Sequence, residues 1–165
     1  MSAAEFVIAT GLTAVLAGLI ATEYAYFTRS FSALQHYMYL SGKSRYAMDR
    51  MSRDIRQADS ITAFATNQLT ISLAGTNVTF NYNATDRTLS RQSAGTTEVF
   101  LTGCDYLRFD VFDRSTVSNS FSFTAATNVT SAKVVQMDWV CSKKIFGKKG
   151  ATENIQSAVV TLRKQ

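Results

Sequence analysis

The residue best placed to do chemistry in this sequence is an acid, Glu5, at the start of a long uncharged run. No charged residue occurs from Phe6 to Thr22. A carboxylate buried in lipid is costly unless it is paired. The α-amino group of Met1 is the natural partner, but one turn of helix holds it in a fixed place beside its own Glu5. The same amine on a neighbouring, axially shifted helix could meet the carboxylate directly, which predicts an ion pair between chains.

No set of residues in this sequence predicts catalysis. The sequence has no histidine beside a serine or cysteine nucleophile pattern, no glycine-rich loop that could hold a phosphate, and no HExxH motif. Its one histidine, His36, is far along the chain from both cysteines. We therefore expect no enzymatic activity, no cofactor and no metal site.

The two cysteines, Cys104 and Cys141, are too few for an ordinary metal site. They predict a disulfide for a domain that lies outside the cytoplasm. Closing the loop of residues 105–140 would add roughly 4 kcal/mol to the free energy of unfolding in the chain-entropy account. Two buried free thiols are the alternative.

A short basic segment lies near the C-terminus, in a chain whose net charge is +5. Its lysines surround Phe146. This pattern predicts either a solvated hairpin tip or an anion-binding tip that contacts DNA or an acidic surface without sequence specificity. The lysines are Lys143, Lys144, Lys148 and Lys149.

A long helix over about residues 1–58 must position Glu5. Three interpretations compete for residues 1–22. A signal peptide is disfavoured because no Lys or Arg precedes Arg29. A simple membrane anchor fits the apolar run, which makes roughly 26 Å of helix, but has no use for Glu5. An assembly element explains both, and its core would contain Phe6, Val7, Ile8, Leu12, Val15, Leu16, Leu19 and Ile20.

From Glu23 onward the helical pattern becomes amphipathic. A first apolar stripe, Phe27, Phe31, Leu34 and Met38, is expected to face sister helices. A second stripe is expected to pack on the globular head. This second stripe contains Met48, Met51, Ile55 and Ala58, and i,i+4 ion pairs are expected to join Asp49 to Arg45 and Arg53, and Asp54 to Arg50.

After Asp59 the pattern changes from helical to alternating, which predicts an antiparallel β-rich head. The fold class is therefore α+β, with the long N-terminal helix packed on the head. Residues 1–28 form the hydrophobic membrane or filament-core half of the helix, and residues 29–165 form its amphipathic half plus the head. Trp139 is expected in the core. The predicted strands cover 61–66, 68–73, 78–82, 88–92, 98–101, 106–112, 120–124, 133–140 and 156–163.

Glu5, the hydrophobic helix that follows it, the β-rich remainder and the late cysteine pair together resemble the type IV pilin superfamily, which includes the pseudopilins of type II secretion. The chain departs from the family's usual Phe-Thr-Leu start and from its frequent proline near position 22. The strand order, and the pairing expected between LTGCDYLRFDVFD and KVVQMDWV, resemble the minor pilin and pseudopilin J group.

The resemblance implies a structural subunit of an extracellular bacterial filament. A prepilin peptidase would expose Met1 as an N-methylated terminus. The chain would then sit in the inner membrane as a single-pass protein. Inner-membrane assembly machinery would pack it with copies of itself or related pilins, with Glu5 neutralising a neighbour's amine. In family filaments part of the helix often melts, and here we expect any melting between Gly11 and Gly18; the alternative is a continuous helix whose glycines allow close packing.

Two other functions remain open from the sequence. One is a minor pseudopilin of a type II secretion system. The other is a membrane-anchored binding module that uses the lysine-rich tip for DNA or surfaces. The second would work with residues 1–22 replaced by any anchor helix, whereas a filament subunit would not.

Overall fold

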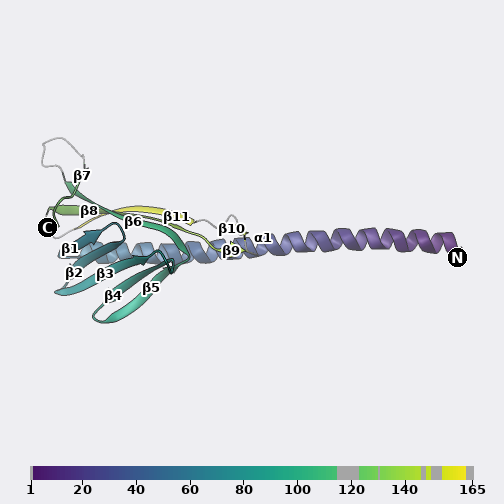
Figure 1. Ribbon diagram of the computed structural model, residues 1–165, viewed down its shortest axis with the longest axis horizontal. Coiled ribbons are helices and arrows are strands. Elements are labelled where there is room, and N and C mark those ends of the chain that lie inside the picture. The colour runs from purple at the N-terminus through teal and green to yellow at the C-terminus, as the bar shows by residue number, and fades with distance from the viewer. Residues whose placement is uncertain (1, 115–122, 130, 146–147, 150–153, 163–165) are drawn as a thin grey trace.

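The computed structural model describes residues 1–165 except 1, 115–122, 130, 146–147, 150–153 and 163–165. One helix, α1 (Ala3–Gln57), runs the length of the molecule (Figure 1). The chain contains no proline that could interrupt it. Ser2 caps its first turn, and the backbone becomes extended at Ala58. The long helix predicted from the sequence is confirmed.

The first sheet is an antiparallel meander in which each strand pairs with the next along the chain. Its turns at Ala74–Gly75 and Ala94–Gly95 have positive φ at both residues. This is the type I′ geometry, which matches the natural twist of a two-residue hairpin. The strands are β1 (Ser60–Ala65), β2 (Gln68–Leu73), β3 (Thr76–Asn83), β4 (Thr88–Ser93) and β5 (Thr96–Thr102).

The second sheet has the strand order β11-β8-β6-β7. Its two central strands, β6 and β8, pair from Cys104 opposite Cys141 to Asp113 opposite Ala132, which confirms the predicted pairing. A short hairpin, β9 with β10, stands apart from both sheets. The bounds are β6 (Cys104–Arg114), β7 (Phe123–Ala125), β8 (Ala132–Cys141), β9 (Lys144–Ile145), β10 (Lys148–Lys149) and β11 (Asn154–Thr161).

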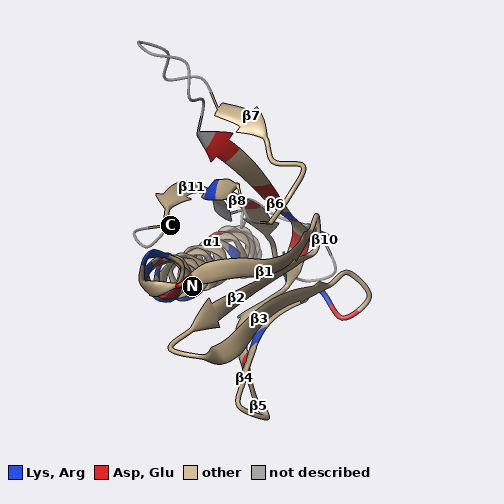
Figure 2. Ribbon diagram, turned by 90° about the vertical axis from the view of Figure 1, so that its left-hand side faces the viewer, with Lys and Arg blue, Asp and Glu red and all other residues tan. Residues whose placement is uncertain are grey.

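The C-terminal half of α1 lies between the two sheets, as the view along the helix shows (Figure 2). The helix contacts β2 and β5 of the first sheet and β11 of the second. Side chains from all three layers fill the core, among them Met51, Phe80 and Trp139, each fully buried. The α+β fold is therefore confirmed, and its architecture is consistent with the pilin fold.

The strands predicted from alternation are all present, with bounds that differ by a few residues. The prediction for residues 120–124 is tested only from residue 123, because 120–122 lie outside the described residues. Trp139 is confirmed as a core residue. Alternation located these strands because each sheet has one face against α1 and the other toward water.

Candidate assembly surface

Glu5 lies in the first turn of α1, where it forms a capping box with Ser2. The backbone N–H of Ser2 donates to Glu5 Oε2 at 2.8 Å, and the backbone N–H of Glu5 donates to Ser2 Oγ at 3.3 Å. The box satisfies two N–H groups that a helix start leaves unpaired. This box was not predicted, although Ser-x-x-Glu is a readable capping signal. Met1, the predicted source of the partner amine, lies outside the described residues.

The capping box leaves part of the Glu5 carboxylate available. A carboxylate has two oxygens with about four acceptor sites. Within the described part of the chain, Oε2 accepts from Ser2 and no contact engages Oε1. The box also holds the charge at the N-terminal end of the helix dipole, where a negative group is favoured. Glu5 can therefore cap its own helix and accept from a cation on another chain.

The apolar side chains that follow Glu5 have no cover from their own chain. The exposed fractions of the large ones run from 52% for Leu16 to 70% for Ile8. Leaving such a side chain in water costs about 1.5–3 kcal/mol relative to burying it. With a mean hydropathy of 1.9 in its most apolar window, α1 is long and apolar enough to cross a membrane. All the predicted assembly-core residues from Phe6 to Ile20 lie in this exposed part.

An aromatic band continues the exposed surface toward the head. The band consists of Tyr24, Tyr26, Phe27, Phe31, Tyr37 and Tyr39, all exposed. The rings of Phe27 and Phe31 are 6.3 Å apart and nearly parallel. The first buried residue of α1 is Leu40. Phe27, Phe31 and Leu34 therefore lie beyond the head, whereas Met38 borders a groove that is also lined by β5. The contact of the stripe with sister helices stays a prediction.

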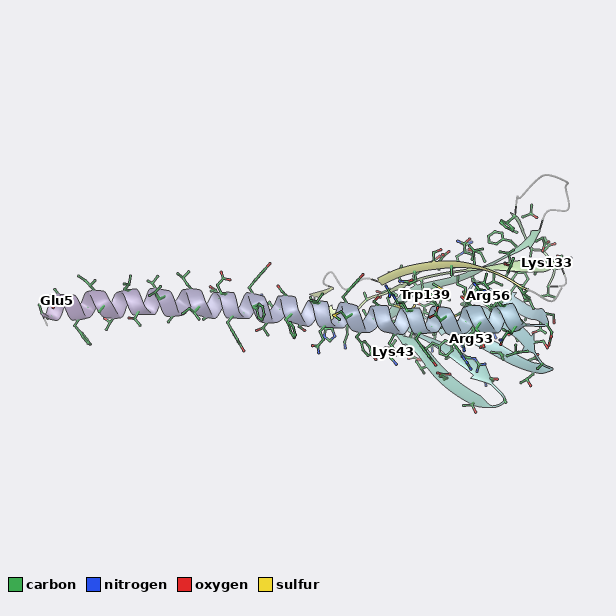
Figure 3. The ribbon with its side chains drawn as sticks, turned by 180° about the vertical axis from the view of Figure 1, so that it is seen from behind. Glu5, Lys43, Arg53, Arg56, Lys133 and Trp139 are labelled. Atoms are coloured by element: carbon green, nitrogen blue, oxygen red, sulfur yellow. The ribbon has the colours of Figure 1, made fainter. Side chains whose placement is uncertain are left out.

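The helix–head joint uses a longer stripe than the one predicted. Met51, Ile55 and Ala58 are buried as expected, while Met48 is only partly buried. The stripe also begins earlier, and its polar member Ser44 accepts a 3.2 Å hydrogen bond from Trp139 Nε1. Figure 3 shows Trp139 against α1, with Glu5 at the opposite, free end. The buried residues that the sequence analysis missed are Leu40, Ser44, Ala47 and Asp54.

Of the ion pairs predicted along α1, the one between Asp54 and Arg50 is confirmed, at 4.0 Å. Asp54 is buried, however, and its closer partner is Arg91 of β4, whose Nε lies 2.7 Å from Asp54 Oδ2. Asp49, which the structure describes as exposed, forms no ion pair with Arg45 or Arg53. Arg91 is the closer partner because an ion pair between a partly buried guanidinium and a buried carboxylate is stronger than ion pairs on the exposed surface of a helix.

The structure brings Cys104 and Cys141 together at the end of the β6–β8 ladder. They are directly opposite each other and fully buried. Opposed residues of antiparallel strands lie within the Cα separation that a disulfide needs. Here they are free thiols, and hydrogen bonding to Cys141 together with burial raises the pKa of Cys104. The disulfide stays a prediction, and no group of His, Cys, Asp or Glu in the described residues could hold a metal.

Arg87 holds the strand ends together beside the cysteines. Its Nη2 donates to the carbonyl oxygens of Gly103 and Ser142, each at 3.1 Å, and lies 2.6 Å from Asp105 Oδ1. Gly103 has a φ of 74°, and an added Cβ there would stand 2.7 Å from Ser142 O. The sequence gives no sign of this contact, because the partners come from the start of β6, the residue before it and the segment after β8.

The basic segment folds as a hairpin, as the sequence predicts, but not at the far tip of the head. Lys144 pairs with Lys149, and Lys148 pairs with Ile145. In Figure 1 β9 and β10 lie at the end of the head that faces the N-terminus, and β9 contacts α1. Phe146 lies outside the described residues. A role as a distal contact for DNA is therefore less favoured by position than the sequence alone indicates.

Comparison with protein-family models, curated proteins and solved structures found no match to this chain. The function of this chain must therefore be inferred from its own residues. Two features carry it: a carboxylate at the start of an uncovered apolar helix, and a folded head that covers only the other half of that helix.

Proposed function

We propose that this chain is a structural, non-catalytic subunit of a type IV pilus-like extracellular filament. The observation that carries the proposal is Glu5 at the head of an apolar helix surface that its own chain leaves exposed. Such a surface needs lipid or other helices around it, because exposure to water is costly. A membrane anchor alone would need the apolar run but not the acid.

In this mechanism the subunit first lies in the inner membrane, with Met1 as the terminus left by prepilin peptidase. The assembly machinery then transfers it into a bundle with copies of itself or related pilins. The side chains from Phe6 to Ile20 exchange lipid contacts for contacts with neighbouring helices. Glu5 pairs with the α-amino group of a neighbour's Met1, and this pair fixes the axial register because each helix offers one acid and one amine.

The capping box makes a sharp test possible, because it separates the charge of Glu5 from its capping role. Glu5→Gln removes the charge but keeps a residue that can complete the capping box. Ser2→Ala removes the capping hydroxyl but keeps the charge. We expect Glu5→Gln to reduce filament yield at least tenfold and Ser2→Ala to leave most filaments intact. The readout is sheared filaments counted by electron microscopy, normalised to subunit in the membrane fraction.

The reverse pattern would contradict the proposal. If Ser2→Ala abolished filaments and Glu5→Gln did not, Glu5 would act only as a helix cap. Extraction of membranes with alkaline carbonate controls for insertion, since both variants keep the whole apolar run. Both proteins should remain in the membrane pellet.

Two alternative functions, a minor pseudopilin and a membrane-anchored binding module, can each be distinguished from a filament subunit by experiment. A minor pseudopilin would be scarce in purified filaments and required for secretion, so subunit abundance separates it from a main filament subunit. A membrane-anchored binding module is favoured only by the lysine hairpin. Replacing residues 1–22 with an unrelated anchor helix would preserve the function of such a module and abolish that of a filament subunit.

A further inference from the structure

A groove lies between α1 and β5 at the end of the head nearer the exposed half of the helix. It consists of two adjoining cavities of about 500 and 130 Å³ that share Tyr39, Lys43, Val99 and Phe100. Figure 3 shows Lys43 at this end of the head. We call it the α1–β5 groove, lined by side chains from residues 38–46 of α1 and 98–102 of β5. Along α1 it extends for about 12 Å.

The lining of the groove is largely apolar and largely uncovered. Phe100 is buried, and its ring centre lies 6.0 Å from that of Tyr46 in an edge contact. Four other lining side chains are exposed, from 51% for Tyr46 to 65% for Met38, with Tyr39 and Val99 between them. An exposed apolar cluster of this kind marks a surface that binds another molecule.

Gly42 leaves the helix side of the groove open. A Cβ added there would meet no atom within 4 Å. A glycine inside a helix lowers the stability of the helix, but it allows another molecule to approach the backbone closely. The groove therefore has room for a large side chain from outside the chain beside Gly42.

A second copy of this chain offers side chains that match the groove. Phe27 and Phe31 are 67% and 59% exposed, and their ring centres are 6.3 Å apart. They lie one turn apart on one face of α1, and Glu23 lies one turn before them on the same face. Glu23 is the only acid between Glu5 and Asp49. Helices that bind in grooves present anchors with this spacing.

The charges of the two surfaces are complementary. Lys43 Nζ lies 6.0 Å from the centre of the Tyr39 ring. Within the described part of the chain, neither Lys43 nor Glu23 forms an ion pair. A parallel copy shifted by about 22 Å toward the head brings its Phe27 level with Gly42. The same shift brings its Glu23 close to the level of Tyr39, where the Lys43 ammonium lies.

We infer that the α1–β5 groove binds residues 23–31 of a second copy, with Phe27 and Phe31 in the groove and Glu23 against Lys43. The inference rests on the filament of the proposed function and adds a contact that Glu5 does not make. The groove and the bound segment are different surfaces of one chain, so the contact continues from copy to copy without closing. Its shift of about 22 Å exceeds the rise of about 6 Å between Met1 and Glu5, so the groove binds a different neighbour from the one that meets Glu5.

The test exchanges the two charges in cells that assemble the full chain. Glu23→Lys and Lys43→Glu each bring like charges together and should lower the yield of sheared filaments at least about tenfold. The double variant Glu23→Lys/Lys43→Glu restores opposite charges and should return the yield to within about twofold of native. Within one chain the two residues are about 30 Å apart along α1, so rescue can arise only between copies. Yields are normalised to subunit in the membrane fraction.

A second pair of variants tests the space in the groove. Gly42→Leu fills it and should lower the filament yield by a similar factor. The urea midpoint of this variant, followed by Trp139 fluorescence in detergent, should stay the same or rise, because leucine favours a helix more than glycine does. Gly42→Ala also removes the glycine but leaves the groove open, so it is the matched control and should keep the native yield.

Native yield in the single charge variants or in Gly42→Leu would overturn the inference. Loss of filaments in the single variants without rescue in the double variant would also overturn it, and would assign the groove to another occupant, such as a lipid or a different protein. If all these variants assembled normally while Glu5→Gln did not, the proposed function would stand and only the groove contact would fail. Absence of filaments from the native chain would contradict both.

Discussion

The two halves of α1 differ in what covers them rather than in whether they are helical. Both are continuous helix without proline, and both carry large apolar side chains. From Leu40 to Ala58 two sheets cover one stripe of the helix and leave its arginines outside. From Ser2 to Phe31 every side chain is exposed. The chain therefore supplies a partner for one half and leaves the partner of the other half to lipid or to another molecule.

The largest expected effect on the folded half comes from its buried acid. Asp54→Ala leaves Arg91, only 13% exposed in its side chain, without its 2.7 Å partner. Removing one member of a buried pair costs about 3–5 kcal/mol. We expect urea unfolding of the full chain in detergent, followed by Trp139 fluorescence, to shift by that amount. Asp49→Ala, at an exposed position on the same helix, is the matched control and should change stability by about 0.5 kcal/mol or less.

If Asp54→Ala and Asp49→Ala changed the free energy of unfolding equally, the contrast between the covered and the exposed surface of α1 would be wrong. It would mean that the Asp54–Arg91 contact adds nothing to the joint beyond a surface charge. Arg91→Ala should also lower stability, but by less than Asp54→Ala, because Asp54 keeps Arg50 at 4.0 Å as a second partner.

A second matched pair compares the two halves directly. Met51 is fully buried, whereas Met38 is 65% exposed. Met51→Ala should lower the free energy of unfolding by about 2–5 kcal/mol through lost contacts and a residual cavity. Met38 only borders a groove of the head, so Met38→Ala should change this free energy by about 0.5 kcal/mol or less and act mainly on filament yield, since its partner in our proposal is another chain. A fall in head stability for Met38→Ala would show that this part of α1 packs on its own head.

The smallest effect is a pH dependence of the reduced protein. The pKa of Cys104 is raised above its ordinary value of 9.0 by its hydrogen bond with Cys141 and by burial. The same hydrogen bond lowers the pKa of Cys141, so below the ordinary value the two shifts act on stability in opposite directions. Well above it the unfolded chain has lost both thiol protons while Cys104 of the folded chain keeps its own, so the free energy of unfolding falls by up to about 1.4 kcal/mol per pH unit.

Urea titrations in a reductant between about pH 9 and 10.5, above the ordinary thiol pKa, measure this slope. Oxidation to the predicted disulfide removes both thiols, so the slope should disappear and the unfolding midpoint should rise. A reduced protein with a flat profile over this range would contradict the raised pKa. The exposed half of α1 contains no cysteine, so it contributes nothing to the comparison.

Much of the fold was readable from the sequence because its signals are local. Alternation in β2, β3 and β6 and the turns after Leu73 and Ser93 depend on neighbours a few residues apart. The Asp54–Arg91 pair and the Ser44–Trp139 hydrogen bond join residues far apart in the chain. No helical or strand period encodes them, so the local partner Arg50 was predicted for Asp54 but the closer partner Arg91 was not.

The features of the candidate site were likewise predictable only where the sequence signal is local. The acid, the apolar run and the opposed cysteines could be located from residue types and spacing. The capping box was readable from the Ser2-x-x-Glu5 spacing but was not predicted, because only amines were considered as partners of Glu5. The place of the lysine hairpin could not be predicted, since it depends on where β8 ends relative to α1.

The most direct measurement is the structure of the purified filament at side-chain resolution, read at Glu5. Our proposal predicts that the Glu5 carboxylate lies within hydrogen-bond distance of the N-terminal amine of a neighbouring subunit, with the residues from Phe6 to Ile20 buried between helices. A filament in which Glu5 contacts only its own Ser2, or a protein that stays monomeric when extracted from the membrane under assembly conditions, would contradict the account.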